Sequence, residues 1–118
     1  MLKHVVMWKF KEDSELEKAY ASDKNKSNFI NKSEDIKADI KKTLKTRLEA
    51  LVGVIPELIS LKVIELPLQT STHDVALICE VKSEKDLEGY AKDKRHTEII
   101  ESCIKPYLTE RCCLDYIE

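Results

Sequence analysis

Several features that decide fold class are scarce or missing in this sequence. It has two glycines and three prolines among 118 residues, so the connections between elements are expected to be short or polar. No apolar run approaches the ~18 residues of a membrane span. Charged residues in the opening stretch MLKHVVMWKFK take the place of the apolar region of a secretory signal. We therefore expect a cytoplasmic protein with no membrane partner.

An excess of positive charge is also missing. Lysine and arginine number 20 against 22 aspartates and glutamates, which gives a net charge of -2. This balance lacks the basic footprint of nucleic-acid binding, so no nucleic-acid partner is expected. Apolar residues make up 42% and charged residues 36%, and the length suits one domain with one hydrophobic core.

The four cysteines form no recognisable metal or redox motif. None is part of a C-x-x-C pair, and no histidine lies at the spacing of a zinc knuckle. Cys112 and Cys113 are adjacent, so in a strand their side chains point to opposite faces. We expect four buried, reduced thiols, no metal site and no cofactor.

Hydrophobic periodicity, in contrast, is clear. Period-two alternation predicts strands over 2–11, 58–66, 73–82 and 109–118. Repeats of three and four residues predict helices over 33–52, 83–92 and about 95–104. The order strand, helix, strand, strand, helix, strand predicts an α+β fold with a ferredoxin-like split βαβ sheet.

The first strand carries two different faces. Leu2 and Phe10 share one face with His4, Val6 and Trp8. On the other face the middle positions, 5 and 7, are also apolar. A sheet that is apolar on both sides needs cover on both sides. Helices are expected to cover one face, and a partner subunit the other.

Residues 13–32 are the least regular part of the sequence. Ser14 is expected to cap a short helix, and Phe29 and Ile30 to anchor the polar stretch that follows it. Further on, Ser33 and Ser83 are predicted N-caps of the longer helices. Gly53 is placed to end the helix over 33–52 in a left-handed conformation.

The stretch SEKDLEGYAKDKRHTEII holds a phenol and an imidazole, Tyr90 and His96. In one unbroken helix six residues are roughly 240° of rotation, so the two side chains would diverge. Continuing the first apolar stripe would also turn Lys94 and Arg95 inward, which is unfavourable for unpaired charges. We therefore expect the chain to turn between Ala91 and His96. His96 would then face Tyr90 and the first strand.

With these elements in place, the sequence resembles the stress-responsive A/B barrel (Dabb) family. The resemblance covers nearly the whole chain. It rests on KHVVMWKFK, the leucine-rich helix leading into VIPEL, HDVALICEVKSEKDLEGYAKDKRH and the closing CLDYIE. The family implies one domain over 1–118 with a four-stranded antiparallel sheet, dimerising through the sheet face into an α+β barrel. It also makes residues 13–32 look like an insertion.

The resemblance further implies a site. Most family members have no assigned reaction, but a plant relative that cyclises a polyketide uses a Tyr and a His at the spacing of Tyr90 and His96. It has another His at the position of His4. The family often reads Tyr-x-x-His-Pro-x-His, whereas Asp93 and Lys94 replace that His and Pro here. Tyr90 and His96 are therefore the candidate catalytic residues, with His96 as general base and Tyr90 polarising a carbonyl.

His4, Val6 and Trp8 are the candidate ligand-binding residues, in a mostly apolar pocket. A lone histidine or tryptophan on such a face is also typical of a core. Three functions stay open: a homodimer that binds a small apolar or carbonyl-containing ligand, a cofactor-free cyclase, lyase or isomerase, and a haem-dependent monooxygenase. The third needs His96 or His4 as axial ligand. His73, next to Asp74, is expected at the surface.

Overall fold

Nine elements of secondary structure make up the computed structural model, which describes residues 1–23 and 32–118. They are β1 (Leu2–Phe10), α1 (Asp13–Ala21), α2 (Ser33–Glu49), β2 (Ser60–Ile64), β3 (Val75–Val81), α3 (Glu84–Lys92), α4 (Lys94–Cys103), the 3-10 helix η1 (Lys105–Tyr107) and β4 (Leu108–Ile117). The predicted anchors Phe29 and Ile30 lie outside the described residues.

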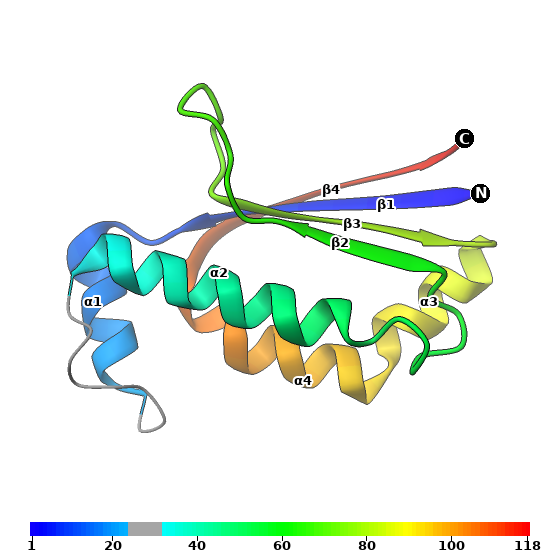
Figure 1. Ribbon diagram of the computed structural model, residues 1–118, viewed down its shortest axis with the longest axis horizontal. Helices are drawn as coiled ribbons and strands as arrows, with labels where there is room; N and C mark the ends of the chain where they lie inside the picture. Colours follow the sequence, from blue (N-terminus) through cyan, green and yellow to red (C-terminus); the bar gives the residue numbers. More distant parts are fainter. Residues whose placement is uncertain (24–31) are drawn as a thin grey trace.

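The four strands form one antiparallel sheet in the order β2-β3-β1-β4. The helices lie on one face of this sheet, and its other face is open (Figure 1). β1 is central and pairs with both β3 and β4, the last strand of the chain. This arrangement confirms the predicted α+β, ferredoxin-like sheet. It also places β1 between the two halves of the chain, where its inner face can contribute to a site.

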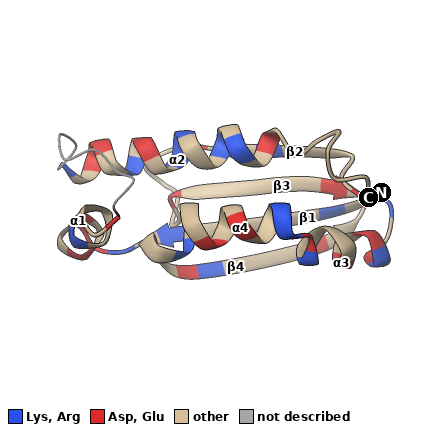
Figure 2. Cartoon of the chain, turned by 90° about the horizontal axis from the view of Figure 1, so that it is seen from below, with Lys and Arg blue, Asp and Glu red and all other residues tan. Residues whose placement is uncertain are grey.

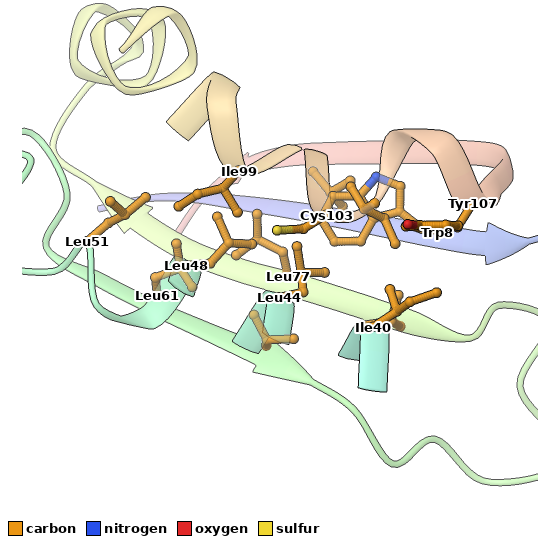
Figure 3. Packing of buried hydrophobic residues seen from close by; sticks show 14 of the residues in the cluster. Trp8, Ile40, Leu44, Leu48, Leu51, Leu61, Leu77, Ile99, Cys103 and Tyr107 are labelled. Carbon is orange, nitrogen blue, oxygen red and sulfur yellow. The ribbon is translucent and has the colours of Figure 1, made fainter. Parts of the chain in front are cut away.

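The core lies between the sheet and α2. Ile40, Leu44 and Leu48 of α2 are no more than 1% exposed, because their spacing of four residues puts them on one helix face. They pack against Trp8 and Leu77 from β1 and β3 (Figure 3). Burying such side chains is the main stabilising term of a domain this size. The inner face of the sheet is therefore fixed by the alternation that predicted it.

Two predicted N-caps are wrong. Ser14 and Ser33 lie within α1 and α2, and the residues that precede these helices are Glu12 and Lys32. Neither cap makes a side-chain hydrogen bond. Acidic residues in both first turns interact favourably with the positive end of the helix dipole instead. Ser83, in contrast, accepts a hydrogen bond from the Asp86 amide, as predicted.

Several elements are shorter than predicted. α2 ends at Glu49, so Val52 is outside the helix and 39% exposed, while Gly53 has the expected left-handed conformation (φ 88) in the turn that follows. β2 ends at Ile64, where its pairing with β3 stops. Beyond it the chain leaves the sheet as a projecting loop in which Leu66 is 86% exposed (Figure 1). The strand predicted over 58–66 is longer than β2 because Leu66, an apolar residue of this loop, fits the period-two pattern.

The open face of the sheet is apolar along its middle. Val5 lies between Ile78 and Leu114 in the strand register, and Met7 lies between Ala76 and Cys112. Leu114 is 64% exposed.

The helix layer carries acidic and basic residues on α2 and α4 (Figure 2). No helix among the described residues is long and apolar enough to cross a membrane.

Candidate functional site

The boundary between α3 and α4 is a single extended residue, Asp93. Its backbone (φ -64, ψ 130) ends α3 and begins α4. The Asp93 carboxylate accepts a hydrogen bond from the Arg95 amide at 2.9 Å, which makes it an N-cap. This cap turns the chain without the proline that the family often has here. The predicted turn between Ala91 and His96 is confirmed.

The turn brings Tyr90 and His96 together. Their ring centroids are 4.3 Å apart, with 46° between the ring planes. Tyr90 is fully buried. Its hydroxyl oxygen and His96 Nδ1 are both buried, and neither has a hydrogen-bond partner among the described residues. Such unpaired buried groups are uncommon and point to a missing partner such as water or a ligand.

A cavity of about 240 Å³ lies next to this pair. The predicted residues His4, Val6 and Trp8 of β1 line it together with His96 of α4. Tyr90 does not line it, but its ring contacts that of His96, which does. The complete set of lining residues is His4, Val6, Trp8, Leu77, Ala91, His96, Thr97, Ile100, Glu101 and Arg111. The structure thus unites the predicted site residues around one cavity and its wall.

The cavity also carries charged groups that the sequence did not predict. Arg111 of β4 and Glu101 of α4 place opposite charges in its lining, and Thr97 adds a hydroxyl. The sequence analysis missed these residues. Arg111 shares the helix-side face of β4 with Cys113 and Asp115, where the period-two pattern is polar. That run of polar residues on one strand face was the available signal.

Asp115 is a further residue that sequence reasoning missed. It lies opposite His4 in the β1–β4 register, and its carboxylate is hydrogen-bonded to His4 Nδ1. Because Nδ1 is engaged in this way, Nε2 is the nitrogen that His4 can offer to a ligand. A carboxylate on one nitrogen fixes the orientation of the imidazole and the tautomer it presents. His4 is 9% exposed and lines the cavity. The hydrogen bond to Asp115 therefore fixes a polar ring in the cavity wall.

Burial controls the ionisation of the Tyr90–His96 pair. It lowers the pKa of His96 to about 4, with a further lowering from His4 nearby. Burial also raises the pKa of Tyr90. At neutral pH the pair is therefore a neutral imidazole beside a neutral phenol. His96 is therefore a weaker base than a free imidazole, because its surroundings disfavour the charged form.

All four cysteines are free thiols, as predicted, but they are not all buried. Cys79 and Cys103 are buried, whereas Cys112 is half-buried and Cys113 is exposed, because β4 is an edge strand. Burial and the nearby Asp115 carboxylate raise the pKa of the Cys113 thiol. His73 is more covered than predicted: its side chain is 18% exposed, with Nε2 3.5 Å from Cys112 Sγ.

Residues 2–118 match the model of the stress responsive A/B barrel domain, Dabb. The chain belongs to the Dabb family. A search of curated protein sequences gave no match.

Solved structures with the same fold share little sequence with this Dabb chain. A dimeric protein of unknown function with a ferredoxin-like fold from Bacteroides fragilis is 22% identical, with a TM-score of 0.74 over 98% of this chain and 93% of that one. A Dabb family protein from Mesorhizobium loti is 9% identical, with a TM-score of 0.64 over 99% and 95%. The hydroxynitrile lyase from Passiflora edulis is 13% identical, with a TM-score of 0.65 over 99% and 92%.

Proposed function

We propose that this Dabb protein binds a small carbonyl-containing compound in the cavity between β1 and α4. The observation that carries the proposal is that His96, whose buried Nδ1 has no hydrogen-bond partner among the described residues, lines that cavity. Its ring contacts Tyr90, whose buried hydroxyl also lacks a partner there. Leaving such groups unpaired costs free energy, which a ligand that hydrogen-bonds one of them recovers. In this proposal His4, Val6 and Trp8 contact the ligand, and Tyr90 supports the His96 ring.

The cavity limits the kind of ligand. Its volume of about 240 Å³ is below the ~300–1,000 Å³ range of pockets for drug-sized molecules, so the ligand is a small one. Val6, Trp8 and Ile100 offer apolar contact, and the imidazoles offer hydrogen bonds. Arg111 adds a planar cation suited to a carbonyl or carboxylate oxygen. A haem exceeds this volume, so the geometry does not favour a haem-dependent monooxygenase.

A cofactor-free lyase is the second candidate function. The structural similarity to a hydroxynitrile lyase makes cyanohydrins a reasonable substrate class to test. Cleavage requires a base to take the hydroxyl proton, while the bond to the nitrile carbon breaks and cyanide leaves with a carbonyl compound as coproduct. The Asp115 carboxylate is hydrogen-bonded to His4 Nδ1, which leaves Nε2 of His4 to accept the proton. His4 is therefore better placed than His96 to act as the base. His96, which lines the cavity, would contact the carbonyl oxygen, and Tyr90 would support the His96 ring.

Binding is best tested by NMR, because the single tryptophan lines the cavity. Benzaldehyde and mandelonitrile are the probes, and the Trp8 indole N–H resonance should shift on saturable binding of either. The variant Ala91→Leu fills the cavity and should abolish the shift, whereas the matched Ala91→Ser keeps it open and should retain it. Equal responses of both variants would place the probe elsewhere. Release of benzaldehyde from mandelonitrile tests the lyase.

We also propose that the protein is a homodimer joined through the open face of its sheet. The similar Bacteroides fragilis structure is described as dimeric. The apolar rows centred on Val5 and Met7 suit an interface of this kind.

A cytoplasmic location and an inserted segment at 13–32 remain predictions. Free thiols fit the first, and α1 (Asp13–Ala21) lies within the range of the second.

A further inference from the structure

Three metal-binding side chains converge at the edge of the sheet beside the cavity. They are His4, Cys113 and Asp115, and their donor atoms all lie within 4.8 Å of one another. Cys113 Sγ is 3.6 Å from His4 Nδ1 and 3.5 Å from Asp115 Oδ1. The strand register explains this: Asp115 lies opposite His4, and Cys113 is two residues earlier on the same face. β1 and β4 run side by side there (Figure 1).

We infer that His4, Cys113 and Asp115 form a binding site for one divalent transition-metal ion, with zinc as the best fit. Zinc takes thiolate, imidazole and carboxylate ligands in tetrahedral geometry, with bonds of about 2.0–2.3 Å. Those bonds place neighbouring donor atoms about 3.3–3.6 Å apart. Both distances from Cys113 Sγ already match this separation. Asp115 Oδ1 and His4 Nδ1 are closer, in a hydrogen bond that opens to admit the ion.

The ligand types also suit this ion. One thiolate and one carboxylate balance its double charge, and the imidazole is neutral. The soft sulfur of Cys113 favours zinc over magnesium or calcium, which prefer oxygen ligands. Binding releases the Cys113 thiol proton to solvent, and the His4 imidazole carries its hydrogen on Nε2. Cys113 and Asp115 are exposed, so water or a ligand can fill the fourth coordination position.

The same geometry disfavours a nucleophilic triad. In a triad the imidazole contacts the carboxylate through one nitrogen and the nucleophile through the other. Here Cys113 and Asp115 both approach Nδ1 of His4, so proton transfer through the ring is not arranged. Three donors around one point are instead the arrangement of a coordination site. It is also the only such group found within residues 1–23 and 32–118.

The opposite face of β4 supplies a matched control. There Cys112 Sγ is 3.5 Å from His73 Nε2, which is 3.8 Å from Glu110 Oε2. This set has the same ligand types, but its three donor atoms do not all lie within 4.8 Å of one another. Cys112 and Cys113 are adjacent residues of one strand. Replacing each by serine therefore changes the same atom type on opposite faces.

Cobalt(II) is a suitable probe, because bound thiolate gives it a near-ultraviolet charge-transfer band. The full chain, kept reduced with a phosphine, should bind one cobalt per subunit with this band and release it to zinc. Cys113→Ser should abolish the band and weaken binding by more than about 100-fold, beyond the effect of losing an outer-sphere partner. Cys112→Ser should keep the charge-transfer band and the wild-type affinity for cobalt. Asp115→Asn should weaken binding without removing the band.

The inference is overturned if the wild-type chain binds no cobalt, if the band survives in Cys113→Ser, or if only Cys112→Ser removes it. Circular dichroism checks that each variant is folded, and Cys113 is exposed, so its replacement leaves the core intact. Ala91→Leu, which fills the ligand cavity, should bind cobalt like the wild type. Metal binding and small-molecule binding are thereby tested separately.

Discussion

Tyr90 and His96 lie ring against ring, 4.3 Å between centroids, yet they share no hydrogen bond and find no partner among the described residues. The contact buries two polar groups next to a cavity. Active and binding sites commonly leave polar groups unsatisfied at a cost in stability, because the ligand completes them. The Tyr90–His96 contact is therefore the feature of this fold that a purely structural role explains least.

This cost predicts the behaviour of Tyr90→Phe. Removing a buried, unpaired hydroxyl should leave the ligand-free protein as stable as the wild type or more stable, by up to about 1–3 kcal/mol. Tyr107→Phe is the control, since the Tyr107 hydroxyl donates a hydrogen bond to Asp23 at 3.1 Å. That variant should lose about 1 kcal/mol. Urea unfolding measures both, and destabilisation of Tyr90→Phe equal to the control would show that its hydroxyl is hydrogen-bonded after all.

The sequence contains more information on this site than on its surroundings. Strand alternation puts His4, Val6 and Trp8 on one face, and the mismatch of helical phase predicts the turn before His96, because both are local patterns. The contact between His4 and Asp115 is different. It joins residues at opposite ends of the chain, and its register depends on how β1 and β4 pair. No local pattern specifies that pairing.

Element ends were predicted least well, for a related reason. Ser14 and Ser33 are good capping residues by type, but the helices begin one or two residues earlier. The exposed Leu66 lies in an apolar stretch that resembles a strand, although β3 offers it no partner. In both cases tertiary contacts decide between local alternatives that the sequence leaves close in energy.

The depressed pKa of His96 predicts an acid-sensitive fold. The unfolded imidazole titrates near 6.5, and the folded one at about 4. Between these values the unfolded state binds more protons, so the free energy of unfolding falls as pH falls from about 6.5 toward about 4, and is fully present above that window. Histidine NMR should give the His96 imidazole a titration midpoint well below 6.5. A His96 midpoint near 6.5 would mean that the ring is in water.

A variant without the imidazole isolates this contribution. His96→Asn removes the group, so the decline in unfolding free energy between pH 7 and pH 5 should be smaller than in the wild type. Equal declines would assign the acid sensitivity to other groups.

The Asp93 cap predicts that the position of His96 depends on a residue outside the cavity. The Arg95 side chain and amide donate hydrogen bonds that lower the Asp93 pKa to about 2, so the carboxylate is ionised at neutral pH. Asp93→Ala removes the cap, and the start of α4 should fray. The His96 and Trp8 resonances should then shift. Asp93→Asn still caps and should leave them near their wild-type positions. Unchanged resonances in Asp93→Ala would show that packing alone holds the turn.

The last prediction concerns the open face of the sheet. Leu114 is 64% exposed and lies next to Val5 on that face, so a partner subunit that covers the face buries it. The wild type should sediment at micromolar concentration with twice the mass of 13.6 kDa. Leu114→Asp buries a charge in such an interface and should yield a folded monomer, because an unpaired buried charge is strongly unfavourable.

Ile117→Asp is the control: Ile117 is 73% exposed on the same strand but pairs with Leu2, on the opposite face. It should remain dimeric. A monomeric wild type, or dissociation of the Ile117→Asp variant alone, would move the interface away from this face.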